Sequence, residues 1–195
     1  DKKLTIDGDT RDDSVSENPR VAFITVSGGA TANMYEKVTL QNGKFAGNAC
    51  VVIMGSKSVF SSKSVFNMYG GVIEECSRAV TANSRTTFNM YGGEIRNCKG
   101  GIGDGGGVLV YEATFIMDGG TISGCTANEG GGLCAEESST VTISGGTISG
   151  CKGVWGGGLY AENSSTIEIS GGTISGCTVG AGGGLFVDSS TIRIS

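Results

Sequence analysis

The chain has 195 residues, a formal net charge of −5, and 36 glycines against a single proline. Its length suffices for one domain with a sizeable core, and the absence of a Gly-x-y period argues against collagen. The acidic balance disfavours nucleic acid and anionic membranes as partners. No apolar run approaches the ~20 residues of a membrane helix, so membrane insertion is not expected.

The first third of the chain, residues 1–64, predicts irregular coils joined by polar loops. The charged segment Asp7–Arg20, which holds the only proline, is expected to be an exposed loop that covers the open end of the first coil. Residues 56–64 form a second polar loop. Short strands are expected at Leu4–Ile6, Val21–Val26, Val38–Leu40 and Cys50–Met54.

From residue 65 to residue 195 the chain repeats itself. The stretch Ser144–Cys151, Ser-Gly-Gly-Thr-Ile-Ser-Gly-Cys, recurs at Ser170–Cys177 and, with aspartate in first place, at Asp118–Cys125. Looser copies end at Cys76 and Cys98, so the repeat length is 22–27 residues. A fixed period of this size, built from short β-type segments and glycine, is typical of a solenoid.

Each repeat contains three short segments that alternate with period 2, as half-buried strands do. Gly-Gly pairs and Gly-Gly-Gly runs separate them, and glycine allows the positive φ or close backbone approach that tight corners require. We therefore predict one all-β domain over residues 1–195, a right-handed parallel β-helix of about seven coils with three short strands per coil. Its inward columns are Val108, Leu133, Leu159 and Leu185; Met68, Met90, Met117, Ile143, Ile169 and Ile194; and Ile73, Ile95, Ile122, Ile148 and Ile174.

Five cysteines occupy one repeat position and are expected to form an inward column. A disulfide ladder within the column is disfavoured because stacked Cβ vectors run parallel about 4.8 Å apart, whereas a disulfide needs Cβ atoms ~3.8 Å apart. A zinc site is disfavoured because the chain has no histidine and no Cys-x2-Cys pair. We predict buried reduced thiols and no metal site. The column is Cys76, Cys98, Cys125, Cys151 and Cys177.

The candidate site is the outward face of the strand that follows each Gly-Gly-Gly run. Exposed apolar patches often mark interaction sites. One interpretation is a glycan-binding groove in which rings stack on sugars and carboxylates bind hydroxyls or Ca²⁺; the other is a face covered by a loop or a neighbouring segment. The first outward column is Leu109, Cys134, Tyr160 and Phe186, the second is Tyr111, Glu136, Glu162 and Asp188, and Trp155 lies at the adjoining corner. Calcium, the single cofactor considered, would bind at Glu136, Glu162 and Asp188.

Two further functions compete with binding. Stacked carboxylates near the ~5 Å separation of a retaining pair raise the alternative of a polysaccharide lyase or glycoside hydrolase acting on an acidic polysaccharide. Neither outward column carries Arg or Lys between Gly105 and Asp188, so we predict no catalytic residue and no enzyme. The third alternative is ice binding by a Thr-x-Ser ladder of three coils, Thr121/Ser123, Thr147/Ser149 and Thr173/Ser175, which Val72/Glu74 and Glu94/Arg96 interrupt.

The segment Ile122–Ala127, followed by Gly131-Gly-Leu133, resembles the repeats of bacterial polymorphic outer-membrane proteins and adhesin-like β-helix proteins. That family's pattern is Phe-x-x-Asn followed by Gly-Gly-Ala-Ile; here Ile122 stands for the Phe and Cys125 for the Asn. The resemblance covers residues 66–195 and implies a secreted or cell-surface protein that binds a glycan or a host-surface protein. A start without methionine and an end in mid-repeat lead us to expect a piece of a longer protein, whose open strand edges favour end-to-end self-association.

Overall fold

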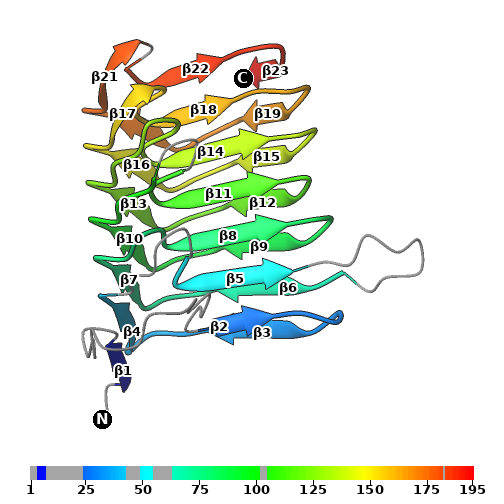
Figure 1. Cartoon of the computed structure of the whole chain (residues 1–195), viewed down its shortest axis with the longest axis vertical. Coiled ribbons are helices and arrows are strands. Elements are labelled where there is room, and N and C mark those ends of the chain that lie inside the picture. Colours follow the sequence, from blue (N-terminus) through cyan, green and yellow to red (C-terminus); the bar gives the residue numbers. More distant parts are fainter. Residues whose placement is uncertain (1–3, 8–23, 43–48, 55–62, 102–104, 182) are drawn as a thin grey trace, which may run out of the picture.

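The computed structural model describes residues 4–7, 24–42, 49–54, 63–101, 105–181 and 183–195. Throughout these residues there are strands and no helix. Three sheets of seven parallel strands each wind into one right-handed β-helix, and up to β16 every third strand along the chain enters the same sheet. Figure 1 shows the coils stacked from β1 at the N-terminal end to β22 and β23 at the C-terminal end. The predicted fold class is confirmed.

Sheet A lies at the left edge of Figure 1 and carries the strands that precede the cysteine column. Its strands are three or four residues long, as the period-2 segments predict. They are β1 (Leu4–Asp7), β4 (Val38–Gln41), β7 (Val72–Glu74), β10 (Glu94–Arg96), β13 (Thr121–Ser123), β16 (Thr147–Ser149) and β20 (Thr173–Ser175).

Sheets B and C form the long sides of the rod. Sheet B follows the Gly-Gly-Gly runs and consists of β2 (Ile24–Val26), β5 (Val51–Met54), β8 (Val80–Asn83), β11 (Val108–Tyr111), β14 (Leu133–Glu136), β18 (Leu159–Ala161) and β22 (Leu185–Val187). Sheet C consists of β3 (Thr31–Met34), β6 (Val65–Met68), β9 (Thr87–Met90), β12 (Thr114–Met117), β15 (Thr140–Ile143), β19 (Thr166–Ile169) and β23 (Thr191–Ile194).

Several predictions for the first third need correction or lie outside the described residues. The strand expected at Val21–Val26 is described only from Ile24, and the strand expected from Cys50 begins at Val51. Strand β3 was not predicted. The covering loop Asp7–Arg20 lies outside the described residues except for Asp7, which ends β1.

The inward columns have the predicted register, and most of their members are buried. Phe88 lies between Phe66 and Phe115 in a stack with ring centroids 5.3 and 5.0 Å apart, all three fully buried. Each fully buried side chain of this kind contributes roughly 1.5–3 kcal/mol. Stability therefore comes from long columns that run through the whole rod. At the C-terminal coil Ile194 is an exception, since 68% of it is exposed.

Glycine is required at two of the three corners of a coil, for a different reason at each. The second glycine of each Gly-Gly pair has a positive φ, +79° at Gly146, for example, and a Cβ there would lie 2.6 Å from the Cε atom of Met117. Gly132, in a Gly-Gly-Gly run, is constrained by space, because its Cβ would lie 2.7 Å from the carbonyl oxygen of Gly158. These close approaches allow successive coils to stack at the spacing of a sheet.

The cysteine column is as predicted except at Cys76, which forms a disulfide with Cys50. The interpretation of Cys76 as a reduced thiol is therefore wrong. Cys50 occupies the position that Gly132 and Gly158 hold in later coils, as the backbone hydrogen bonds before sheet B show. A Cβ on Gly132 would lie 3.3 Å from the sulfur of Cys151, one coil further on. A cysteine at this position thus approaches the cysteine column from the side. Its Cβ vector is not parallel to those of the column, so the geometry that excludes a disulfide between two column members does not apply.

Candidate functional site

The predicted site residues lie on the outward face of sheet B in the predicted register. Strands β11, β14, β18 and β22 pair in order, and backbone hydrogen bonds from Glu162 and Asp188 to the preceding coil extend the second column beyond the strands. The structure therefore aligns the two columns Leu109, Cys134, Tyr160 and Phe186, and Tyr111, Glu136, Glu162 and Asp188.

The apolar column is largely covered by the chain itself. Leu109, Cys134 and Tyr160 are at most 7% exposed and form a small apolar cluster of their own on the outer side of sheet B, with Phe186 packed against it. The glycine runs that lead into each strand fold back over this face, so a Cβ on Gly105 would lie 3.0 Å from the Cβ atom of Cys134. For these three residues the covered interpretation is correct, and they are not available for stacking on a ligand.

Two unpredicted strands lie beside this face, where the ring of Trp155 packs on Phe186. Lys152–Trp155 forms β17 and Thr178–Ala181 forms β21, which pair with each other in a fourth, two-stranded sheet beside the rod. One coil earlier, Glu129 pairs with Trp155 through an isolated β-bridge. Glu129 and Trp155 are therefore equivalent positions of successive covering loops.

Tyr160 links the apolar column to the acidic column. Its hydroxyl donates a hydrogen bond of 2.8 Å to Oε2 of Glu162. Burial raises the pKa of Tyr160, and the hydrogen bond and negative charge of Glu162 raise it further. The phenol is therefore a neutral donor that holds the Glu162 carboxylate against the sheet.

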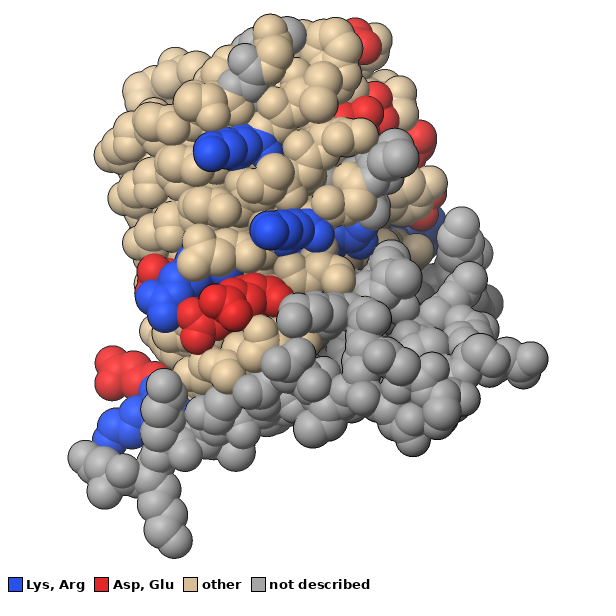
Figure 2. Space-filling view, turned by 60° about the vertical axis from the view of Figure 1, so that its left-hand side comes forward, with Lys and Arg blue, Asp and Glu red and all other residues tan. Residues whose placement is uncertain are grey.

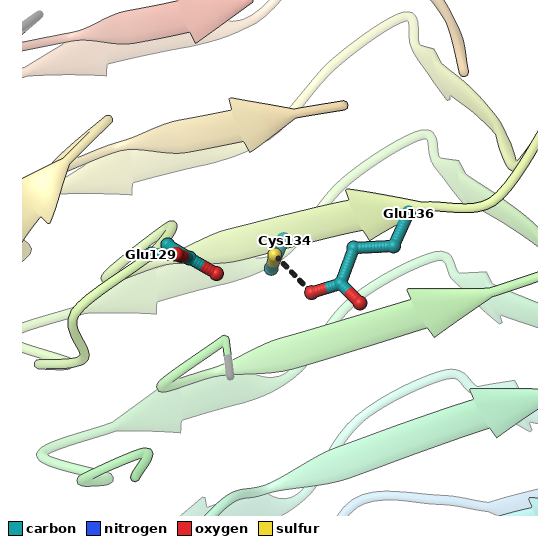
Figure 3. Close-up of side chains that lie close together, drawn as sticks. All are labelled: Glu129, Cys134 and Glu136. Atoms are coloured by element: carbon teal, nitrogen blue, oxygen red, sulfur yellow. Dashed lines mark hydrogen bonds between the residues drawn. The ribbon is translucent and has the colours of Figure 1, made fainter. Parts of the chain in front are cut away.

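Two carboxylates lie on either side of Cys134, as Figure 3 shows. Ligand atoms of Glu129, Cys134 and Glu136 all lie within 4.8 Å of one another, and the thiol donates to Oε1 of Glu136 at 3.1 Å. Burial is the main cause that raises the pKa of Cys134 well above the ordinary thiol value, and the charge of Glu136 adds to it. The cluster thus contains a protonated thiol between two carboxylates, and Glu129 was missed because no repeat motif marks it.

The three acids considered for calcium have different neighbours in the structure. Glu136 lies beside Cys134 and Glu129. Glu162 accepts hydrogen bonds from Tyr160 and Asn163, and Asp188 accepts one from Ser189. Calcium binding by Glu136, Glu162 and Asp188 stays a prediction.

The exposed part of the predicted site is an aromatic surface that we call the Trp155 patch, made of Val154, Trp155 and Phe186. Val154 is 50% and Trp155 43% exposed. The indole packs at a tilt against Phe186, with ring centroids 5.2 Å apart, and Phe186 stacks in turn on Tyr160 at 5.6 Å. The patch therefore presents an exposed indole on a rigid base, with the carboxylate of Glu129 on the coil below.

A second exposed aromatic surface was not predicted. Tyr35, Tyr69 and Tyr91 project from successive coils just beyond sheet C, are 44–58% exposed, and stack with centroids 5.2 and 4.9 Å apart. Asn33, Asn67 and Asn89 form a parallel ladder beside them, joined by amide hydrogen bonds of 2.8 Å. The sequence signal was present in Tyr69-Gly-Gly and Tyr91-Gly-Gly, at the position that Asp118 and Ser144 occupy later. We call the three tyrosines the tyrosine ladder.

Sheet A presents a polar outward face. Thr121, Thr147 and Thr173 align, as do the serines two residues further on, so the hydroxyl ladder has the predicted register. Below it, Arg96 pairs with Glu74 at 2.7 Å and with Glu94 at 2.8 Å. On the face shown in Figure 2 the upper coils carry few charged side chains, while acidic and basic groups gather side by side over the lower coils.

Comparison with curated proteins and with solved structures finds no match. In the part of the chain that the structure describes, no helix has the length and apolar character needed to cross a membrane. Residues 88–195, more than half of the chain, match the family described as right handed beta helix region. This match covers the most regular coils, the cluster of Glu129, Cys134 and Glu136, and the Tyr160–Glu162 pair. The chain belongs to the right-handed β-helix family.

Proposed function

We propose that this β-helix is a non-enzymatic, glycan-binding segment of a secreted or surface-displayed adhesin-like protein, and that the Trp155 patch is its sugar-contacting surface. The observation that carries the proposal is the exposed indole of Trp155, held against Phe186 at 5.2 Å and 43% accessible. An aromatic face carries partial negative charge, so it attracts the C–H groups on the flat side of a sugar ring.

The polar groups around the patch support the same ligand class. Glu129 lies one coil below Trp155 at the equivalent position. The Glu162 carboxylate is oriented by the Tyr160 hydroxyl, which leaves acceptor capacity for sugar hydroxyls. Apolar and aromatic side chains with a few fixed polar groups are the usual lining of a small-ligand site.

The test is a glycan array probed with the recombinant chain, followed by affinity measurements on the best ligand for three proteins. The Trp155→Ala variant is expected to lose at least about 30-fold in affinity, which corresponds to about 2 kcal/mol, the usual threshold of a binding hot spot. The Tyr69→Ala variant removes an equally exposed ring from the tyrosine ladder and is expected to bind like the wild type. Loss of affinity in Tyr69→Ala alone would place the binding surface elsewhere and reject the Trp155 patch.

One observation favours the enzyme alternative. The carboxylates of Glu129 and Glu136 lie within 4.8 Å of each other, close to the ~5–5.5 Å that separates the two carboxyls of a retaining glycosidase. The same ligands should therefore be incubated with the wild type and with Glu136→Gln, and reducing ends should be measured. Turnover that disappears in Glu136→Gln would replace binding by hydrolysis as the function.

A further inference from the structure

Four free thiols form a continuous column inside the rod, which we call the thiol column: Cys98, Cys125, Cys151 and Cys177. The first three are fully buried and Cys177 is half-buried. Each thiol donates a weak hydrogen bond of 3.3–3.5 Å to the carbonyl two residues earlier in its own coil. All four sulfurs therefore point the same way, one above the other at the spacing of the coils.

Neighbouring members of the column lie on adjacent coils. Backbone hydrogen bonds of 2.8–2.9 Å join the residue after each later cysteine to the carbonyl of the cysteine one coil earlier: Thr126 to Cys98, Lys152 to Cys125 and Thr178 to Cys151. The walls are apolar and tight: the position of a Cβ on Gly132 lies 3.3 Å from the sulfur of Cys151 and 2.7 Å from a methyl of Ile148. Soft sulfur atoms thus lie on adjacent coils between apolar walls.

The spacing of the column matches a linear sulfur–metal–sulfur unit. Adjacent strands of a sheet lie about 4.8 Å apart, and two metal–sulfur bonds of about 2.3 Å in line span about 4.6 Å. A soft ion between two stacked thiols would therefore need little movement of the coils. A disulfide within the column, in contrast, requires sulfurs about 2 Å apart.

We propose that the thiol column binds soft two-coordinate metal ions, Cu(I) above all, each held between two adjacent cysteines, so that the four cysteines form two pairs. Thiol ligands select Cu(I) over hard ions such as Ca²⁺ or Mg²⁺. Zinc in structural sites takes four ligands in a tetrahedron, and each gap in the column offers only two sulfurs. On binding, one thiol of the pair releases its proton to solvent and the other coordinates through a lone pair, so that the pair and its Cu⁺ carry no net charge in the apolar interior.

The repeat itself supports a role for the sulfurs beyond filling space. In the loosest copy, Tyr91–Cys98, the residues before the cysteine have changed from Ser-Gly to Arg-Asn, yet the cysteine remains. The neighbouring inward column changes from methionine to isoleucine between Met117 and Ile143. A position that needs only a small apolar side chain would be expected to vary in the same way.

The experiment is an anaerobic titration with Cu(I) against a chromophoric Cu(I) chelator, on protein whose Cys50–Cys76 disulfide is intact and whose five other thiols are reduced. Four column thiols arranged as two adjacent pairs are expected to hold two ions per chain. A thiolate-to-copper charge-transfer band should rise with the first two equivalents. Cys134, the free and fully buried thiol outside the column, provides the control: Cys134→Ala is expected to hold two ions as well.

Two double variants test whether metal binding requires two adjacent thiols or only any two thiols of the column. Cys98→Ala/Cys125→Ala keeps the adjacent pair Cys151 and Cys177 and is expected to hold one ion. Cys125→Ala/Cys177→Ala keeps two thiols that are two coils apart, about 9.6 Å, and is expected to hold none. Far-UV circular dichroism checks that both variants fold. If the second does not, Cys98→Ala/Cys151→Ala replaces it, because it keeps Cys125 and Cys177 two coils apart and is likewise expected to hold none. Equal binding by the two double variants, or less than one ion in the wild type, would overturn the proposal.

Discussion

The buried thiols should make the stability of the rod fall steeply in alkaline solution. Cys125, Cys134 and Cys151 are fully buried, and their pKa values are raised above the ordinary 9.0 of a thiol. For Cys134 the main cause is burial; for Cys151 it is the contact with Cys125, followed by burial. The contact with Cys151 lowers the pKa of Cys125, but its contact with Cys98 and its burial outweigh this effect.

The direction and size of this loss of stability follow from proton linkage. In the unfolded chain the three thiols ionise near their ordinary pKa, whereas in the folded rod they stay protonated to higher pH. Above about pH 9 the folded state thus binds more protons than the unfolded state, and the free energy of unfolding falls as pH rises. Each thiol contributes about 1.4 kcal/mol per pH unit, so three thiols remove about 4 kcal/mol at pH 10, a large part of a typical domain's stability.

The assay is guanidinium unfolding followed by far-UV circular dichroism between pH 7 and about 10, without oxygen and without reductant so that the disulfide persists. The matched variant is Cys125→Ala/Cys134→Ala/Cys151→Ala, each protein being compared with its own stability at neutral pH. The wild type should lose stability above pH 9 while the variant changes little. If both lose the same amount, ionisation of these thiols is not the cause and the reasoning fails.

Three further changes test the packing of the coils. Phe88→Ala should lower the free energy of unfolding by about 5 kcal/mol, since it removes a buried phenyl ring and two stacking contacts; a loss below about 2 kcal/mol in chemical denaturation would contradict a continuous column. Gly146→Ala and Gly150→Ala both place alanine at positive φ, at a cost of about 1–2 kcal/mol, but only the Gly146 Cβ meets neighbours, at 2.6 Å. Gly146→Ala should therefore lower the melting temperature further than Gly150→Ala, and equal shifts would argue against the clash. Replacing Cys50 and Cys76 by alanine opens a bridge between residues 26 apart in sequence and should cost about 3.5 kcal/mol of unfolding free energy on the loop-entropy estimate, which the shift in denaturation midpoint measures.

The inward columns were predictable because their signal is redundant. Ile122, Ile148 and Ile174 alternate with polar neighbours within each strand and recur at a fixed distance along the chain, so two periodicities agree on the same face. Parallel stacking in register then follows from equal repeats, and the pairs Ile122–Ile148 and Ile148–Ile174 are found as expected. The Gly-Gly corners were equally readable, because glycine adopts a positive φ without steric cost. The corners between sheets B and C gave no such signal, because residues such as Glu137 and Ser138 adopt a positive φ there without glycine.

The covering loops were not predictable, because their structure depends on the coil beside them. Lys152–Trp155 and Thr178–Ala181 pair at three of their four positions but share no period-2 pattern, and each contains a glycine that weakens a strand signal. The burial of Cys134 and Tyr160 follows from the segments that lead into sheet B, with Gly105 beside Cys134 and Gly156 beside Tyr160, and not from the strands that carry the two residues. The disulfide escaped prediction for a similar reason: Cys50 bonds Cys76 from a glycine position of the adjacent corner, outside the repeat column.

The rod keeps its interior apolar and varies its outward columns, so different coils present different chemical groups. Along one outward column the residues change from Tyr69 and Tyr91 to Asp118 and Ser144, while the inward neighbours stay apolar. Because each coil contacts only its neighbours, such changes affect the core little, and ligand-facing side chains can be exchanged coil by coil. The exposed aromatic groups concentrate where the repeat is broken, at the tyrosine ladder and at Trp155. We therefore expect the ligand-binding residues at these departures from the repeat, and the residues that determine folding within the repeat itself.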